Sequence, residues 1–148
     1  MCVSAAIALA SCKTVPLKPS NESKAKVALS AAADVNPDAT GKPSPVIVRV
    51  YQLKGDAAFS GADFFALFDD DMKVLGPELI AREEYVLTPS EKRTVELAVQ
   101  KTAKFVGVMA AFRDIRNSQW RVVVPAPLKK NDVTLSVERA RVQFAPTR

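Results

Sequence analysis

Histidine is absent from the 148-residue chain, and its two cysteines, Cys2 and Cys12, both lie near the N-terminus. Everything after residue 12 therefore has no imidazole for general-base catalysis and no thiol for a disulfide, a thiolate metal site or a covalent nucleophile. No later apolar run approaches the roughly 18 consecutive residues that a transmembrane helix needs. These absences argue against an enzyme and predict a domain that uses no metal and no cofactor.

Charge and composition are those of an ordinary globular domain. The net charge is +5, with 48% hydrophobic and 25% charged residues. The basic residues are spread along the chain, and no aromatic residues alternate with them as a stacking surface for nucleic acid would require. A solvated surface of mixed charge is therefore favoured over a nucleic-acid site.

The first residues form an apolar run of small side chains that ends in Leu9-Ala10-Ser11-Cys12. A small residue before a cleavage site is typical of secretory signals. The run predicts a signal peptide over residues 1–11, followed by a flexible tether over residues 12–25, which is rich in lysine and proline. Because Leu-Ala-Ser-Cys resembles the lipobox of bacterial lipoproteins, this resemblance implies that the tether is lipidated at Cys12. The alternative is an ordinary helix or strand with a buried free thiol.

From residue 26 to residue 145, alternating apolar residues predict a single β-rich domain. Turn residues separate the predicted strands every 8–15 positions, which favours an all-β, two-sheet β-sandwich over parallel βαβ units. Apolar residues on both faces mark residues 46–53 and 104–113 as central strands. The predicted strands are 26–35, 46–53, 78–87, 94–99, 104–113, 119–124 and 133–144, the last with a bulge where its apolar phase shifts.

A short helical insert is predicted at residues 63–68, where Phe64, Leu67 and Phe68 recur at helical spacing and Ser60 or Asp63 can cap the start. Residues 69–71 are three aspartates without the spacing of a calcium loop, so a solvated turn at the helix end is expected. The predicted core comprises Val27, Leu29, Val48, Val50, Phe64, Leu67, Val106, Val108, Phe112, Trp120, Val122 and Leu135.

The segment Asn36-Pro37-Asp38, the run from Gly41 to Lys54, and Phe112-Arg113-Asp114 leading to Trp120 carry a family resemblance. Together with a Leu-Ala-Ser-Cys segment that resembles the lipobox of bacterial lipoproteins, they resemble the TssJ (SciN) family of type VI secretion lipoproteins. The resemblance implies a transthyretin-like β-sandwich, anchored to the periplasmic face of the outer membrane through acylated Cys12. It also implies a structural role: binding the periplasmic domain of the inner-membrane protein TssM.

In that family the loop between the first two strands is the main contact with TssM. Without the resemblance, turn chemistry alone explains these residues equally well. The partner-binding residues that the resemblance implies are Val35, Asn36, Pro37, Asp38, Ala39, Thr40, Gly41, Lys42, Pro43 and Ser44.

Two other classes of function make different predictions from this one. A periplasmic lipoprotein that binds a small ligand or peptide predicts a concave apolar pocket with a few convergent polar groups. A hydrolase with paired carboxylates is disfavoured, because Glu83 and Glu84 are adjacent on a predicted strand and point to opposite faces. Arg49 is expected at a sheet edge or surface, with its stem lying across apolar neighbours.

Overall fold

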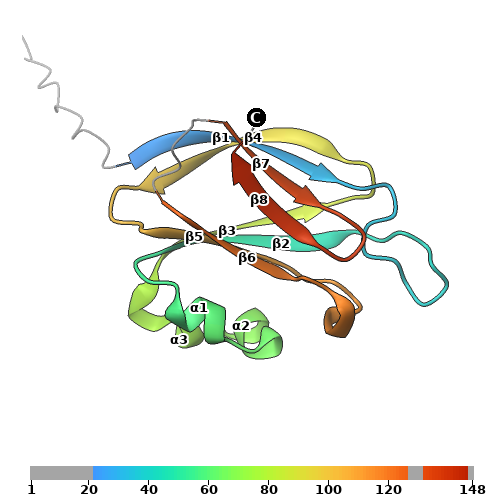
Figure 1. Cartoon of the computed structure of the whole chain (residues 1–148), viewed down its shortest axis with the longest axis horizontal. Helices are drawn as coiled ribbons and strands as arrows, with labels where there is room; N and C mark the ends of the chain where they lie inside the picture. Colours follow the sequence, from blue (N-terminus) through green and yellow to red (C-terminus); the bar gives the residue numbers. More distant parts are fainter. Residues whose placement is uncertain (1–21, 127–131, 147–148) are drawn as a thin grey trace, which may run out of the picture.

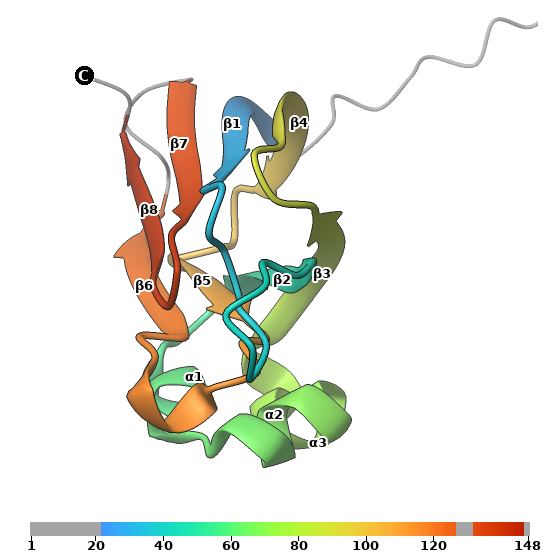
Figure 2. The same ribbon diagram turned by 90° about the vertical axis from the view of Figure 1, so that its right-hand side faces the viewer.

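The protein is built from two stacked β-sheets with a group of short helices beneath one of them (Figures 1 and 2). The computed structural model describes residues 22–126 and 132–146. The strands are β1 (Glu22–Ala31), β2 (Val46–Leu53), β3 (Leu79–Leu87), β4 (Lys92–Gln100), β5 (Phe105–Ala110), β6 (Arg121–Pro125), β7 (Asp132–Val137) and β8 (Val142–Pro146). The helices are α1 (Ala57–Gly61), α2 (Phe64–Asp69), α3 (Asp71–Leu75), and the 3-10 turns η1 (Gly76–Glu78) and η2 (Ile115–Asn117).

Each sheet has four strands, in the orders β4-β1-β7-β8 and β3-β2-β5-β6. β1 pairs in parallel with β7, and the other strand pairs are antiparallel. The connection from β1 to β2 therefore crosses from one sheet to the other. This arrangement confirms the all-β, two-sheet sandwich predicted from the alternation of apolar residues.

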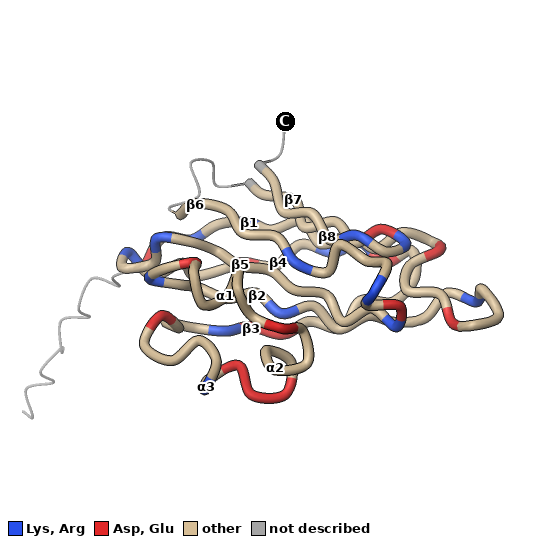
Figure 3. Tube along the Cα trace, turned by 60° about the horizontal axis from the view of Figure 1, so that its bottom comes forward, with Lys and Arg blue, Asp and Glu red and all other residues tan. Residues whose placement is uncertain are grey.

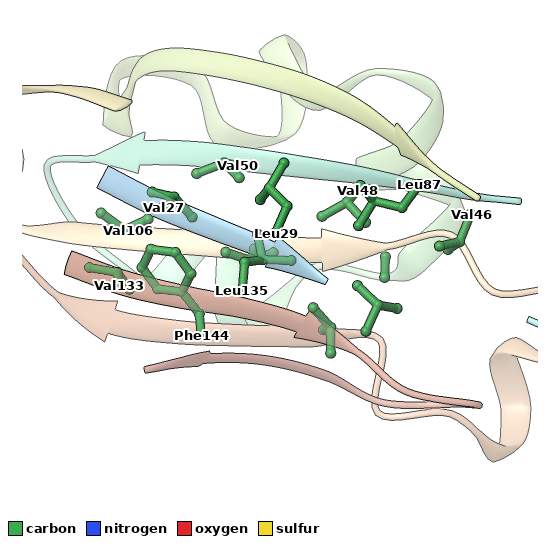
Figure 4. Close-up of a cluster of buried hydrophobic side chains, with 14 of the residues drawn as sticks. Val27, Leu29, Val46, Val48, Val50, Leu87, Val106, Val133, Leu135 and Phe144 are labelled. Carbon is green, nitrogen blue, oxygen red and sulfur yellow. The ribbon is translucent and has the colours of Figure 1, made fainter. Parts of the chain in front are cut away.

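The main core fills the space between the sheets (Figure 4). Val27 and Leu29 on β1 face Val48 and Val50 on β2, and all four are at most 3% exposed. Burial of these alternating apolar faces is the dominant stabilising contribution to such a fold. Of the predicted core residues, Trp120 and Val122 are half-buried at its margin, while Phe64 and Leu67 belong to a second cluster.

The second cluster lies on the outer face of the β3-β2-β5-β6 sheet, under the helical insert formed by residues 56–78. Tyr51 and Met109 point outward from the central strands β2 and β5 and pack against Phe59, Leu67 and Leu75. The insert thus explains why the central strands are apolar on both faces: one face meets the other sheet and the other meets the helices.

Three expectations about the number and bounds of the helices and strands differ from the structure. β1 starts at Glu22, so residues 22–25 pair with β4 although they were assigned to the tether. The predicted bulged strand 133–144 is wrong: it is a hairpin of β7 and β8, whose turn at residues 138–141 lacks the usual Gly, Pro or Asn. The insert contains α1 and α3 in addition to the predicted helix, since helices of five residues are too short to show a periodicity.

Polar contacts at the margins join the two sheets. The Gln52 side chain on β2 donates to the carbonyl of Ala98 (2.7 Å) and accepts from the backbone N–H of Gln100 (2.8 Å) on β4 of the other sheet. At another margin, the Gln119 N–H donates to the Ala140 carbonyl at 2.9 Å. None of the helices in residues 22–126 and 132–146 is long and apolar enough to cross a membrane.

Candidate partner interface

The loop between β1 and β2 projects from the end of the sandwich opposite the start of β1 (Figure 1). Its tip, residues 39–42, is exposed, while Pro37, Asp38 and Pro43 are half-buried. Val35 is fully buried in the main core, and Ser44 is also buried. Val35 was expected to offer an apolar contact to a partner; instead it anchors the loop to the domain. The surface that the predicted set presents is therefore residues 37–43.

Asn36 fixes the base of the loop. It is buried with a positive φ of 47°, a conformation that Asn tolerates better than most residues. Its side-chain nitrogen donates to the Pro45 carbonyl (2.7 Å), and its side-chain oxygen accepts from the Arg113 N–H (2.7 Å). Its own N–H donates to the Arg139 carbonyl (3.1 Å). One side chain and one amide thus join the β1–β2 loop to the β5–β6 and β7–β8 connections.

Asp38 organises the tip. Its Oδ1 accepts hydrogen bonds from the Thr40 N–H (2.8 Å), the Thr40 hydroxyl (2.7 Å) and the Lys42 N–H (3.0 Å). These bonds lower the pKa of the Asp38 carboxyl, with the Thr40 hydroxyl as the largest cause. Gly41 follows at a φ of 84°, which a side chain would strain. The tip is consequently a turn of defined shape.

A surface groove of about 590 Å³ lies between this loop and the two neighbouring connections. Phe112, which is 6% exposed, belongs to the main core and also lines the groove. Sequence reasoning did not assign the far wall, since strand pairing between distant segments brings it here. The residues lining the groove are Asn36, Pro37, Asp38, Ala39, Phe112, Arg113, Asp114, Arg139 and Ala140.

A second polar cluster lies under the helical insert and corrects two expectations. Arg49 is on central strand β2, so the edge alternative is wrong. It lies on the outer surface of the sheet, where the insert covers it, and its guanidinium donates to Glu84 (2.7 Å) and to the Phe68 carbonyl (2.8 Å). Asp71 is not part of a solvated turn: it is 3% exposed and accepts from Arg82 (2.7 Å) and from the Tyr51 hydroxyl (3.0 Å). Burial raises the pKa of Tyr51. These groups satisfy one another, so the cluster fixes the insert to the sheet.

The alternative of a ligand pocket between the sheets finds no support in the core. Valine, leucine and phenylalanine side chains occupy that space (Figure 4). Another described hollow, of about 550 Å³, is an open groove at the surface between β6 and β8. Among the described residues no group of three or more acidic, cysteine or histidine side chains is placed to hold a metal ion.

Comparison with solved structures finds the same fold in proteins of one secretion system. The T6SS lipoprotein TssJ1 from Pseudomonas aeruginosa is 31% identical with a TM-score of 0.77, over 86% of this chain and 98% of that one. A chain of a type VI membrane complex is 30% identical (TM-score 0.76; 83% of this chain, 98% of that one). A chain in the structure described as the T6SS protein TssM C-terminal domain from EAEC is 29% identical (TM-score 0.69; 84% and 98%).

Curated protein sequences give no significant match to the chain. A family model does match it, over residues 23–140, and is described as type VI secretion lipoprotein, VasD, EvfM, TssJ. The matched segment covers nearly the whole sandwich, including the β1–β2 loop and the helical insert. The chain therefore belongs to the TssJ (SciN) family of type VI secretion lipoproteins.

Proposed function

We propose that this protein is a structural lipoprotein that holds the type VI secretion apparatus to the outer membrane by binding the periplasmic domain of TssM. Acylated Cys12 is the proposed anchor, and residues 37–43 of the β1–β2 loop are the proposed contact. Supporting this role, a chain 29% identical to this one occurs in the structure described as the TssM C-terminal domain. The role is structural, with no catalytic step.

The observation that carries the proposal is the placement of the loop. β1 begins at Glu22 at one end of the sandwich and leads into the loop at the opposite end (Figure 1). Cys12 itself lies outside the described residues. Ten positions separate it from Glu22, a chain length that spans at most about 35 Å. A domain anchored through this segment carries its loop at the end of the sandwich farthest from the point of attachment.

The loop is also prepared for binding. Asn36 fixes its base and Asp38 fixes its tip, while Pro37 and Pro43 restrict the backbone further. A preordered loop loses little conformational entropy on docking, and this raises affinity without additional contacts. Lys42 adds an exposed charge at the tip.

The test is to replace residues 37–42 by a Gly/Ser linker while keeping Asn36, and to measure binding of the TssM periplasmic domain by calorimetry. Affinity is expected to fall at least about tenfold, or about 1.4 kcal/mol. The matched control changes exposed Lys101 and Thr102, in the turn after β4 at the opposite end, to serine. Unchanged affinity in the loop variant, with an intact circular dichroism spectrum, would place the interface elsewhere.

The anchor is tested separately by Cys12→Ser in cells, with Ser11→Ala as the control for a neutral change beside it. The serine variant is expected to leave the outer-membrane fraction, because stable anchoring depends on the acyl chains. Its retention in that fraction would show that another part of the protein holds it there.

A further inference from the structure

The outer surface of the helical insert exposes large apolar side chains. The described residues include three exposed large hydrophobic side chains: Phe65 (60% exposed), Met72 (72%) and Val86 (52%). Phe65 and Met72 lie on the consecutive helices α2 and α3, and Val86 lies on edge strand β3. Single exposed apolar residues are common on proteins, but two on so short an insert are not accounted for by packing.

The fold itself does not require these side chains. Phe64 and Leu67 supply the buried face of α2, and Leu75 supplies that of α3. Phe65 packs edge-on against the Phe64 ring (5.2 Å between centroids), but most of its own surface meets water. Lysine or glutamine would serve the helix at least as well at position 65 or 72, since these residues have a higher helix propensity than phenylalanine and one about equal to that of methionine.

The surface is held in a fixed shape. Asp63 caps α2 by accepting from the Phe65 and Ala66 N–H groups, and Asp70 caps α3 by accepting from the Lys73 N–H. Below them, buried Asp71 is bonded to Tyr51 and Arg82 of the sheet. An apolar surface on such a preordered support binds without a large ordering cost.

The insert is predominantly acidic. Residues 56–78 contain five aspartates and Glu78 against a single basic residue, the exposed Lys73 on α3, in a chain whose net charge is +5. Asp71 is neutralised by Arg49 and Arg82, which leaves Asp56, Asp63, Asp69 and Asp70 around the insert. Figure 3 shows the acidic stretch running along the connection between α2 and α3.

We propose that this acidic apolar surface, formed by Phe65, Met72 and Asp69, is a second docking surface, which binds a protein segment that carries apolar side chains flanked by lysine or arginine. Phe65 and Met72 gain free energy when the partner's apolar side chains cover them. The carboxylates attract the basic residues and reject acidic segments. Because the surface covers the outer face of one sheet and the β1–β2 loop lies at the end of the sandwich (Figures 1 and 2), one copy can hold two partner segments at once.

The test uses a fluorescein-labelled amphipathic peptide of leucine and lysine, with a leucine–glutamate peptide of the same length as its control. Anisotropy titrations with the full chain are expected to show binding of the lysine peptide that weakens with salt, and much weaker binding of the glutamate peptide. The double variant Phe65→Ser/Met72→Ser is expected to lose at least about tenfold in affinity. Val86→Ser, which removes the exposed apolar residue outside the insert, is expected to change nothing.

A second variant, Asp69→Lys, tests the charge of the surface while leaving its apolar side chains, Phe65 and Met72, unchanged. Asp69 is exposed and caps neither helix, so its replacement is expected to preserve the fold. The affinity for the lysine peptide is expected to fall several-fold, and that affinity is expected to depend less on salt. Equal affinity of both peptides, or of the double variant and the parent chain, would overturn the proposal. So would sedimentation equilibrium or flotation with anionic vesicles, if either showed that Phe65 and Met72 instead hold a second copy or a lipid surface.

Discussion

The Tyr51 hydroxyl donates to the carboxylate of Asp71 at 3.0 Å, and both side chains are almost fully buried. Tyr51 comes from central strand β2, and Asp71 is the first residue of α3. Arg49 and Arg82 approach the same carboxylate oxygen at 3.4 and 2.7 Å. A single acidic group therefore links the helical insert to two strands of the sheet.

Replacing Asp71 by alanine is expected to lower the free energy of unfolding by about 3 kcal/mol, because the buried Tyr51 hydroxyl loses its carboxylate acceptor and Arg49 and Arg82 lose a buried opposite charge. Urea denaturation of the purified domain measures this change. The neighbouring Asp69→Ala, at an exposed position, is expected to stay within about 0.5 kcal/mol of the parent. Similar losses in the two variants would show that the buried cluster does not hold the insert.

Asn36→Ala is expected to destabilise the domain by about 2–3 kcal/mol, since the Arg113 N–H and the Pro45 carbonyl lose their partner and a positive φ is imposed on alanine. Asn36→Gly removes only the backbone strain, so the stability of this variant is expected to lie between that of the alanine variant and that of the parent chain. Thermal melts of the three proteins check this order. If glycine matched the parent, the side-chain hydrogen bonds would contribute little.

Gly107→Ala is expected to cost about 1–3 kcal/mol through overpacking. A Cβ at this position on β5 would lie 3.0 Å from the ring of Phe59, which covers the strand from α1. Combining the change with Phe59→Leu makes room, so the loss in the double variant is expected to be smaller than the sum of the two single losses. Additive losses would mean that the contact with Phe59 is not the cause.

Both tyrosines of the chain are expected to remain protonated at pH 10, the ordinary pKa of a phenol. Burial is the main reason that the pKa of Tyr51 and that of Tyr85 are raised, and the Glu83 carboxylate adds to the effect at Tyr85. A raised pKa in the folded state means that the associated stability is present below pH 10 and is lost as the pH rises above it. Ultraviolet titration is expected to show phenolate at pH 10 in denaturant only; its appearance in the folded protein would contradict this.

Local patterns in the sequence predicted the sandwich and its central strands well, because alternation and apolar runs record which face of a strand is buried. The cap of α2 by Asp63 could be predicted for a similar reason, because Asp63 accepts hydrogen bonds from residues only two and three positions away. The burial of Asp71 could not be predicted from the sequence, since its partners Tyr51 and Arg82 come from two different strands. Nothing in three consecutive aspartates distinguishes the one that will be buried.

The loop illustrates the same limit at the candidate site. Its turn residues located it correctly between β1 and β2, but Val35 and Asn36, at its β1 end, are buried and support the loop. Their roles depend on the core and on Arg113 and Arg139, which are about 77 and 103 positions further along the chain. Contacts between residues so far apart in the chain are determined by the pairing of strands, and a local sequence pattern does not predict them.

The position of β1 has a mechanical consequence. β1 pairs with β4 over residues 22–30 on one side and with β7 over residues 26–31 on the other. If the membrane pulls on the chain before Glu22 and a partner pulls on the loop after Ala31, the tension runs parallel to the strand. The bonds on both flanks are then stretched in shear and share the force, so they resist together instead of opening one after another from an end. The strand between the proposed anchor and the proposed contact would then carry the tension through its hydrogen bonds to both neighbouring strands.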